Sequence, residues 1–166
     1  CENVAMGRNA MRCNTTGDGN LGIGAYALGA NTTADSNTAV GKSALTNNTT
    51  GEQNTAVGVC SLNANTTGSR NVAFGRHALD TNVSGNSNTA IGDQSLFANT
   101  ASNNTALGFY SMASNTSGSC NTGLGQNALT ANTTGTQNVA VGASALLANT
   151  TGTHHVAIGE NSLDAN

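Results

Sequence analysis

The chain of 166 residues contains no proline and no tryptophan, and only 3% of its residues are aromatic. With so few large flat side chains, we exclude the thick aromatic-rich core of many globular enzymes. Charged residues make up 8% of the chain, the formal net charge is −3, and lysine and arginine total five. That balance provides no electrostatic footprint for nucleic acid, so we expect no nucleic-acid partner.

Long apolar runs and targeting signals are missing as well. No stretch approaches the length of a membrane span, and no basic cluster suggests a membrane surface, so we expect no membrane insertion by this segment. The opening letters "CENVAMG" are already part of a repeat rather than a signal peptide, and the last repeat stops partway. We therefore expect residues 1–166 to be a single repeat domain that is a fragment of a longer chain.

A short pattern, N-[TVL]-[AG]-large apolar-G, returns along the whole sequence. Its spacing is 17 residues, except for one step of 16 between Asn88 and Asn104. A fixed period in this range is typical of stacked repeats. The units begin at Asn3, Asn20, Asn37, Asn54, Asn71, Asn88, Asn104, Asn121, Asn138 and His155. Each unit continues with a second apolar segment, x-x-[AS]-[LM], and a polar arm, usually N-T-T-G-x-x.

The repeat favours strands over helices. No apolar series follows helical spacing, whereas the "TAVG" core is rich in β-formers and is bounded by glycine, which predicts a strand of four or five residues. We expect an all-β fold: a parallel β-solenoid, or β-roll, of ten coils of about 17 residues, with one or two strands per coil. The short unit has lost its residue in the polar arm, where a deletion leaves the strand register intact.

Two invariant positions predict structural ladders. The glycine after the first strand suits a bend with positive φ or a close approach between coils. The asparagine that opens each arm would stack on its copies about 4.8 Å apart and donate its amide to the next one. The predicted ladder residues are Asn14, Asn31, Asn48, Asn65, Asn82, Asn99, Asn115, Asn132, Asn149, Gly24, Gly41, Gly58, Gly75, Gly92, Gly108, Gly125 and Gly142.

The first strand is apolar on both faces. Its large position alternates with Ala or Gly, and Val4, Val72, Val139 and Val156 share the face of the large position. One face can line the inside of the coil, but the other needs cover from outside, which association of several chains would supply. The sequence leaves open which face points inward.

Catalytic chemistry has no support in the repeat, because a catalytic site needs unlike functional residues at converging positions. We predict no enzyme activity, no cofactor and no metal site. His154 and His155 are adjacent on an expected strand and so point to opposite faces. The cysteines Cys13, Cys60 and Cys120 lie several coils apart, so we expect free thiols; only Cys1 and Cys13 are near enough to consider pairing.

The segments "NTAVGKSAL", "NTAIGDQSL" and "HVAIGENSL" resemble the head repeats of trimeric autotransporter adhesins and related repeats of bacteriophage and large-virus fibre proteins. All ten units carry the resemblance. It implies a left-handed β-roll in which three chains pack around a common axis. It also implies an extracellular fibre segment on a cell surface or virion, a homotrimer that adheres to a host-surface or matrix receptor. The N-T-T-G arm is longer than in typical autotransporter heads, and no stalk or anchor is present.

Two alternatives use the arm. The first is an ice-binding solenoid, since Thr15, Thr32 and their copies form a rank; Val83 interrupts it. The second is glycosylation, because eight arms contain an N-x-[ST] sequon, such as Asn48-Thr49-Thr50. A repeated Asn-Thr turn accounts for the same letters without sugar. The fibre segment is therefore the favoured hypothesis.

Overall fold

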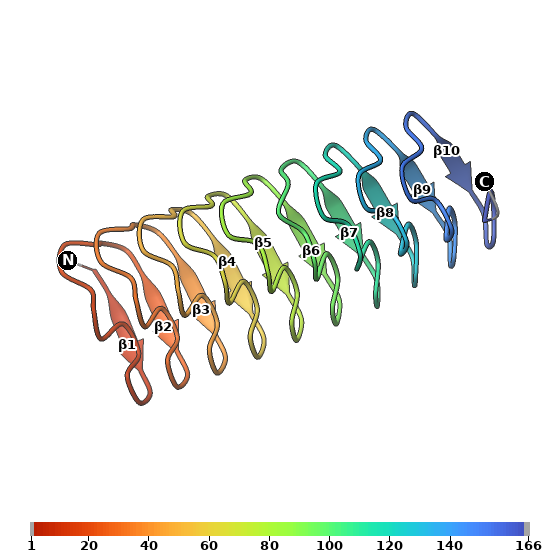
Figure 1. Cartoon of the computed structure of the whole chain (residues 1–166). Helices are drawn as coiled ribbons and strands as arrows, with labels where there is room; N and C mark the ends of the chain where they lie inside the picture. Colours follow the sequence, from red (N-terminus) through yellow and green to blue (C-terminus); the bar gives the residue numbers. More distant parts are fainter. Residues whose placement is uncertain (1, 165–166) are drawn as a thin grey trace.

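The computed structural model describes residues 2–164, which form a stack of short parallel strands in one long sheet (Figure 1). The strand order follows the sequence from β1 to β10, and each coil adds one strand beside the last. The strands are β1 (Val4–Met6), β2 (Leu21–Ile23), β3 (Thr38–Val40), β4 (Thr55–Val57), β5 (Val72–Phe74), β6 (Thr89–Ile91), β7 (Thr105–Leu107), β8 (Thr122–Leu124), β9 (Val139–Val141) and β10 (Val156–Ile158). The predicted all-β parallel solenoid is confirmed.

The register of the sheet holds through the short unit. Thr89 of β6 pairs with Thr105 of β7, and the equivalent residues pair at every other junction. The missing residue is therefore absorbed outside the strands, as expected for a connecting segment. Within residues 2–164 no helix is long and apolar enough to cross a membrane. Cys1 and Asn166, which completes the series of arm asparagines, lie outside the described residues.

Of the one or two strands expected per coil, the structure has one, and the expected strand length of four or five residues was wrong. Each coil has one three-residue strand, and the second apolar segment is a turn. In the third coil Ser43 and Leu45 have φ of 59° and 49°, a left-handed conformation that curls the chain back. This conformation is unfavourable for β-branched side chains, which explains why Leu or Met, and never Val or Ile, occupies the second apolar position.

The core of each coil is thin and contains the small residue of the strand. Ala39 of β3 and Leu45 of the following turn are both fully buried, and the same pair of positions is buried in most coils. The inward face of the strand is therefore the Ala/Gly face, which answers the question that the sequence left open. Since the inside has room for only one large side chain per coil, Val, Ile and Phe at the large position point outward.

The glycine after each strand meets both of its expected requirements. Gly58 has φ of 135°, and a Cβ built on it would lie 2.5 Å from the carbonyl oxygen of Gly75 in the next coil. A side chain at this position would therefore be strained and would collide with backbone. The other glycines of this rank, Gly24, Gly41, Gly75, Gly92, Gly108, Gly125 and Gly142, have the same positive φ.

Candidate functional site on the outer face of the sheet

The strands present two ranks of side chains away from the coil, here called the outer face. The first rank consists of Val4, Leu21, Thr38, Thr55, Val72, Thr89, Thr105, Thr122, Val139 and Val156. The second consists of Met6, Ile23, Val40, Val57, Phe74, Ile91, Leu107, Leu124, Val141 and Ile158. Because the strands pair in register, equivalent side chains lie side by side along the whole sheet.

The outer face carries no charged residue at any of these positions; its second rank is apolar throughout, and its first rank mixes apolar residues with threonine. Several of its large side chains are freely accessible: Phe74 is 55% exposed, Leu107 is 49% exposed and Ile158 is 72% exposed. Single apolar side chains on a surface need no explanation, but a continuous strip of them is typical of an interaction surface.

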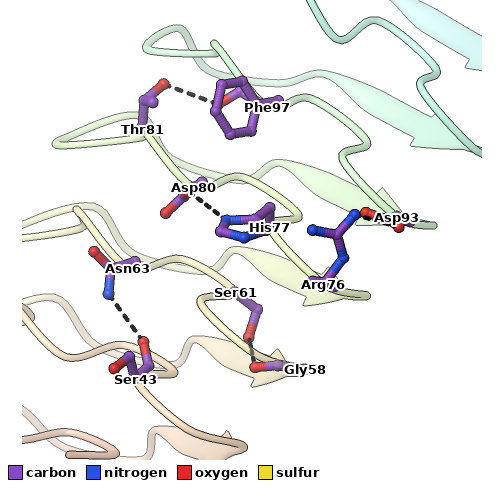
Figure 2. Close-up of polar contacts among 10 residues, drawn as sticks. All are labelled: Ser43, Gly58, Ser61, Asn63, Arg76, His77, Asp80, Thr81, Asp93 and Phe97. Atoms are coloured by element: carbon purple, nitrogen blue, oxygen red, sulfur yellow. Dashed lines mark hydrogen bonds and ion pairs between the residues drawn. The ribbon is translucent and has the colours of Figure 1, made fainter.

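Side chains just after the glycine that is repeated in every unit extend the strip on one flank. Val59 and Phe109 are 44% and 48% exposed, and the ring of Phe109 lies 4.4 Å from that of Tyr110 between centroids. The same flank carries an ion pair, in which Arg76 Nη2 lies 2.9 Å from Asp93 Oδ2 of the next coil (Figure 2). The apolar strip thus has a polar and aromatic rim.

The arm asparagines lie inside the solenoid and form a ladder. Asn48 Nδ2 donates to Asn31 Oδ1 at 3.1 Å and to the carbonyl of Gly51 at 2.9 Å, while Asn65 Nδ2 donates to Asn48 Oδ1 at 2.8 Å. The side chains from Asn31 to Asn132 in this rank are fully buried. Apart from Asn99, each of these fully buried amides therefore satisfies a buried turn and a neighbouring coil at once.

A second asparagine ladder, which the sequence analysis did not separate, precedes the strands. Asn37 Oδ1 accepts from the backbone N–H of Asn54 at 2.9 Å, and Asn54 Nδ2 donates to the carbonyl of Gly68 at 2.8 Å. The signal was present, because this asparagine begins nine of the ten units. In the tenth unit His155 takes its place, and its backbone N–H donates to Asn138 Oδ1 at 3.0 Å.

The burial of the arm asparagines bears on the sequons. The amide nitrogen that would carry a glycan is the same atom that donates to the ladder, as in Asn48. A glycan replaces one of the two hydrogens on Nδ2, so it would remove at least one of these donations, and it would need space that a fully buried side chain lacks. The arm sequons are thus structural turns in the folded chain.

The threonine rank of the arms is also part of the stack. Thr49 Oγ1 donates to the carbonyl of Thr66 at 3.0 Å, and Thr133 Oγ1 donates to that of Thr150 at 3.0 Å. The hydroxyl hydrogens of this rank therefore stabilise neighbouring coils. The residue after it, such as Thr50 or Thr67, is exposed.

The remaining titratable residues do not converge. His77 Nδ1 lies 2.7 Å from Asp80 Oδ2, His154 is exposed, and the described part of the chain contains no cluster of three metal-ligating side chains and no pocket. Cys13 and Cys120 are exposed free thiols, and Cys60 is half-buried and free. Burial raises the pKa of the Cys60 thiol, and nearby Asp80 adds to that effect.

The outer face and the two asparagine ladders are thus the distinctive features of this molecule. Comparison of the chain with protein-family models, with curated proteins and with solved structures finds no match.

Proposed function

We propose that this chain is a structural segment of an extracellular fibre, borne on a cell surface or virion, that assembles by packing copies of itself through the outer face. By its resemblance to adhesin and fibre repeats, the assembly is a homotrimer, and its role is adhesion to a host-surface or matrix receptor. The single observation that carries the proposal is the uncharged outer face, whose second rank is apolar without interruption from β1 to β10.

A second copy of this chain suits the outer face better than an unrelated surface does. The ranks repeat at the strand spacing of about 4.8 Å, and a partner must match that spacing over the whole sheet to cover it. A parallel copy in register has the same spacing by construction and places each residue at the level of its own equivalent. Thr38 and Thr55 then face threonines, while Val72 and Phe74 face apolar residues.

The dimensions of the strip favour three chains over two. Ten strands span about 48 Å, and a three-residue strand is about 10 Å wide, so the strip measures about 500 Å². A stable pair of proteins buries about 800 Å² on each partner. Three chains around an axis can also cover the flank of the strip, including Val59 and Phe109, which adds buried area for each chain.

Light scattering on the purified segment, over a range of concentrations and beside circular dichroism, tests the proposal. We expect a β-rich trimer. In the variant Ile91→Lys, which places a charge in the middle of the outer face, we expect a β-rich monomer. The matched variant Thr67→Lys puts the same charge on an exposed arm and should remain trimeric. A wild-type chain that stays a stable β-rich monomer would overturn the proposal.

The ice-binding alternative retains one supporting observation, which is the exposed second hydroxyl of most arms, as in Thr50 and Thr67. Against it, the first hydroxyl of most arms donates to the next coil, and the short arm has lost its second threonine, so that Ala101 follows Thr100 directly. An ice-shaping assay distinguishes the two functions: we expect round, unshaped crystals in the presence of the segment.

A further inference from the structure

The arm ladder is interrupted at one junction, between the fifth coil (Asn71–Ser87) and the sixth coil (Asn88–Asn103). At every other junction from Asn14 to Asn149, the amide of the later asparagine donates to Oδ1 of the earlier one at 2.7 to 3.2 Å. Asn82 Oδ1 receives no such bond from Asn99. It is buried and has no hydrogen-bond partner, which is costly for a polar atom out of water.

Backbone and hydroxyl bonds between the arms are interrupted at the same place. In the preceding arm, the N–H groups of Thr66 and Thr67 donate to the carbonyl of Val83 at 2.9 and 3.3 Å. Among the described residues, no backbone bond to the sixth arm is made by the N–H of Val83 or Ser84. Since Val83 stands where other arms have threonine, its side chain also has no hydroxyl to donate.

The missing residue explains the interruption. Asn99 Nδ2 donates to the carbonyl of Ala101, two residues ahead, whereas Asn65 Nδ2 donates to Gly68, three residues ahead. Ala101 thus takes the place of the arm glycine, and the residue lost is the second threonine. The shorter arm holds the amide of Asn99 on this nearer carbonyl, so that it makes no bond to Asn82.

The opposite side of this junction carries extra connections (Figure 2). Arg76 pairs with Asp93 at 2.9 Å, and Thr81 Oγ1 donates to the carbonyl of Phe97 at 2.9 Å. The rings of His77 and Phe97 lie edge to face with centroids 6.3 Å apart. Strands β5 and β6 also remain fully paired. On the turn side, the fifth and sixth coils are therefore joined by side-chain and strand contacts. On the arm side, part of the usual hydrogen bonding between the two coils is missing.

We propose that this junction is a hinged opening point, at which residues 82–85 separate from residues 99–101 while the strands and turns stay packed. The second half of the arm limits the opening, because Asn103 N–H donates to the carbonyl of Asn86 at 3.0 Å and Asn86 N–H donates to Ser102 Oγ at 2.9 Å. The arms are not part of the outer face, so the opening point does not depend on the proposed self-association.

Residue-resolved amide hydrogen exchange on the whole chain tests the proposal. Thr66 and Thr67 are the matched reference for Val83 and Ser84, one coil earlier and at the same positions. We expect Val83 and Ser84 to exchange at least about tenfold faster, which is the effect of losing about one net hydrogen bond. On the turn side, the N–H groups of Leu79 and Thr81, which donate to the sixth coil, should stay as protected as that of Leu62.

A repaired variant tests the cause. Inserting threonine between Thr100 and Ala101, together with Ala101→Gly, restores the common N-T-T-G arm and should slow exchange at Val83 to the level of Thr66. The variant Val83→Thr alone adds a hydroxyl without the missing length and should leave exchange fast. In reverse, deleting Thr50 together with Gly51→Ala shortens the third arm and should speed exchange at Thr32 about tenfold.

Each result decides the proposal. Equal exchange at Val83 and Thr66 in the wild-type chain would overturn it, and this comparison needs no variant. Fast exchange on both the arm side and the turn side would overturn the hinge, because the whole junction would then open. Fast exchange that persists in a folded repaired variant would overturn the role of the missing residue. If the repaired variant does not fold, the shortened third arm tests that role instead.

Discussion

The side chains of Met112 and Ser111 fill the space into which a Cβ at Gly123 would project. A Cβ built on Gly123 would lie 3.0 Å from Cγ and 3.2 Å from Sδ of Met112, and 2.8 Å from Oγ of Ser111. Serine also precedes Leu62, which is followed by Ala73 in the next strand, so Met112 is the residue that sets this coil apart. The first coil repeats the arrangement, since a Cβ on Gly22 would lie 3.0 Å from Cγ of Met11. Wherever the turn has leucine, the next strand has alanine, as with Leu45 and Ala56. The turn residue of one coil and the inward strand residue of the next coil therefore share one space in the core, so that the longer methionine requires glycine where leucine allows alanine.

Because Met112 and Gly123 share this space, their substitutions should be coupled in a double-mutant cycle. Gly123→Ala alone should destabilise the chain by about 1–3 kcal/mol, because the added methyl overpacks a core that already contains Met112. In the double variant Met112→Leu with Gly123→Ala, the pair becomes the Leu/Ala pair of the other coils, and most of the loss should be recovered. Chemical denaturation of the wild type, both single variants and the double variant measures the coupling. Simple additivity of the two single effects would contradict the interpretation.

Gly58→Ala should be among the most damaging single substitutions. The new methyl would lie 2.5 Å from the carbonyl oxygen of Gly75, and the φ of 135° is unfavourable for alanine. We expect a loss above about 3 kcal/mol. Gly19→Ser is the matched control, because Ser36 occupies the equivalent position with nearly the same φ, and a Cβ on Gly19 would approach Ser36 no closer than 3.7 Å, an ordinary contact. Thermal unfolding should leave Gly19→Ser close to wild type.

Removal of one rung of the arm ladder should be costly. Asn48→Ala leaves Asn31 Oδ1 and the carbonyl of Gly51 each without the bond from Asn48, and takes the acceptor from Asn65 Nδ2. We expect a loss of about 1–3 kcal/mol for each buried group left unsatisfied, less any relaxation. The neighbouring Asn47 is exposed, so Asn47→Ala should cost no more than about 0.5 kcal/mol. Equal losses for the two variants in denaturant unfolding would argue against the ladder.

Thiol labelling should distinguish Cys60 from the exposed cysteines. Burial raises the pKa of the Cys60 thiol, Asp80 raises it further, and Lys42 opposes the shift. The thiolate is the reactive form, so Cys60 should label more slowly than Cys13 with iodoacetamide near pH 8, and its rate should rise at higher pH. Asp80→Asn removes a nearby negative charge and should speed the labelling of Cys60. Faster labelling of Cys60 than of Cys13 in the wild-type chain would contradict this assignment.

The same shift has a consequence for stability. The folded chain holds the Cys60 proton more tightly than the unfolded chain does, because the folded pKa is raised. As pH rises above the thiol pKa of the unfolded chain, the unfolded state loses its proton first, and stability should fall. Cys60→Ser should remove this part of the pH dependence, which unfolding curves between about pH 8 and pH 10 would measure.

The sequence alone determined the period, the position of each strand and the place of the deletion. The strand "TAV" recurs with its glycine at a fixed spacing. The spacing is fixed because equivalent residues of neighbouring parallel strands must pair in register, so it can be read directly from the sequence. The need for glycine at Gly58 was also readable, since few backbone conformations demand that residue in every unit. The missing residue could be assigned to the arm because a deletion there leaves the pairing register of the strands unchanged.

Only the tertiary structure decided which face of the strand is inside. Alternation separates Ala39 from Val40 but does not rank the two faces, because that choice depends on how closely the turn returns to the strand. The left-handed φ of Leu45 brings the chain back tightly enough to leave space for alanine alone. The same tight return made the second apolar segment a turn. Only the structure showed that the arm that is one residue short leaves Asn82 Oδ1 buried without a partner.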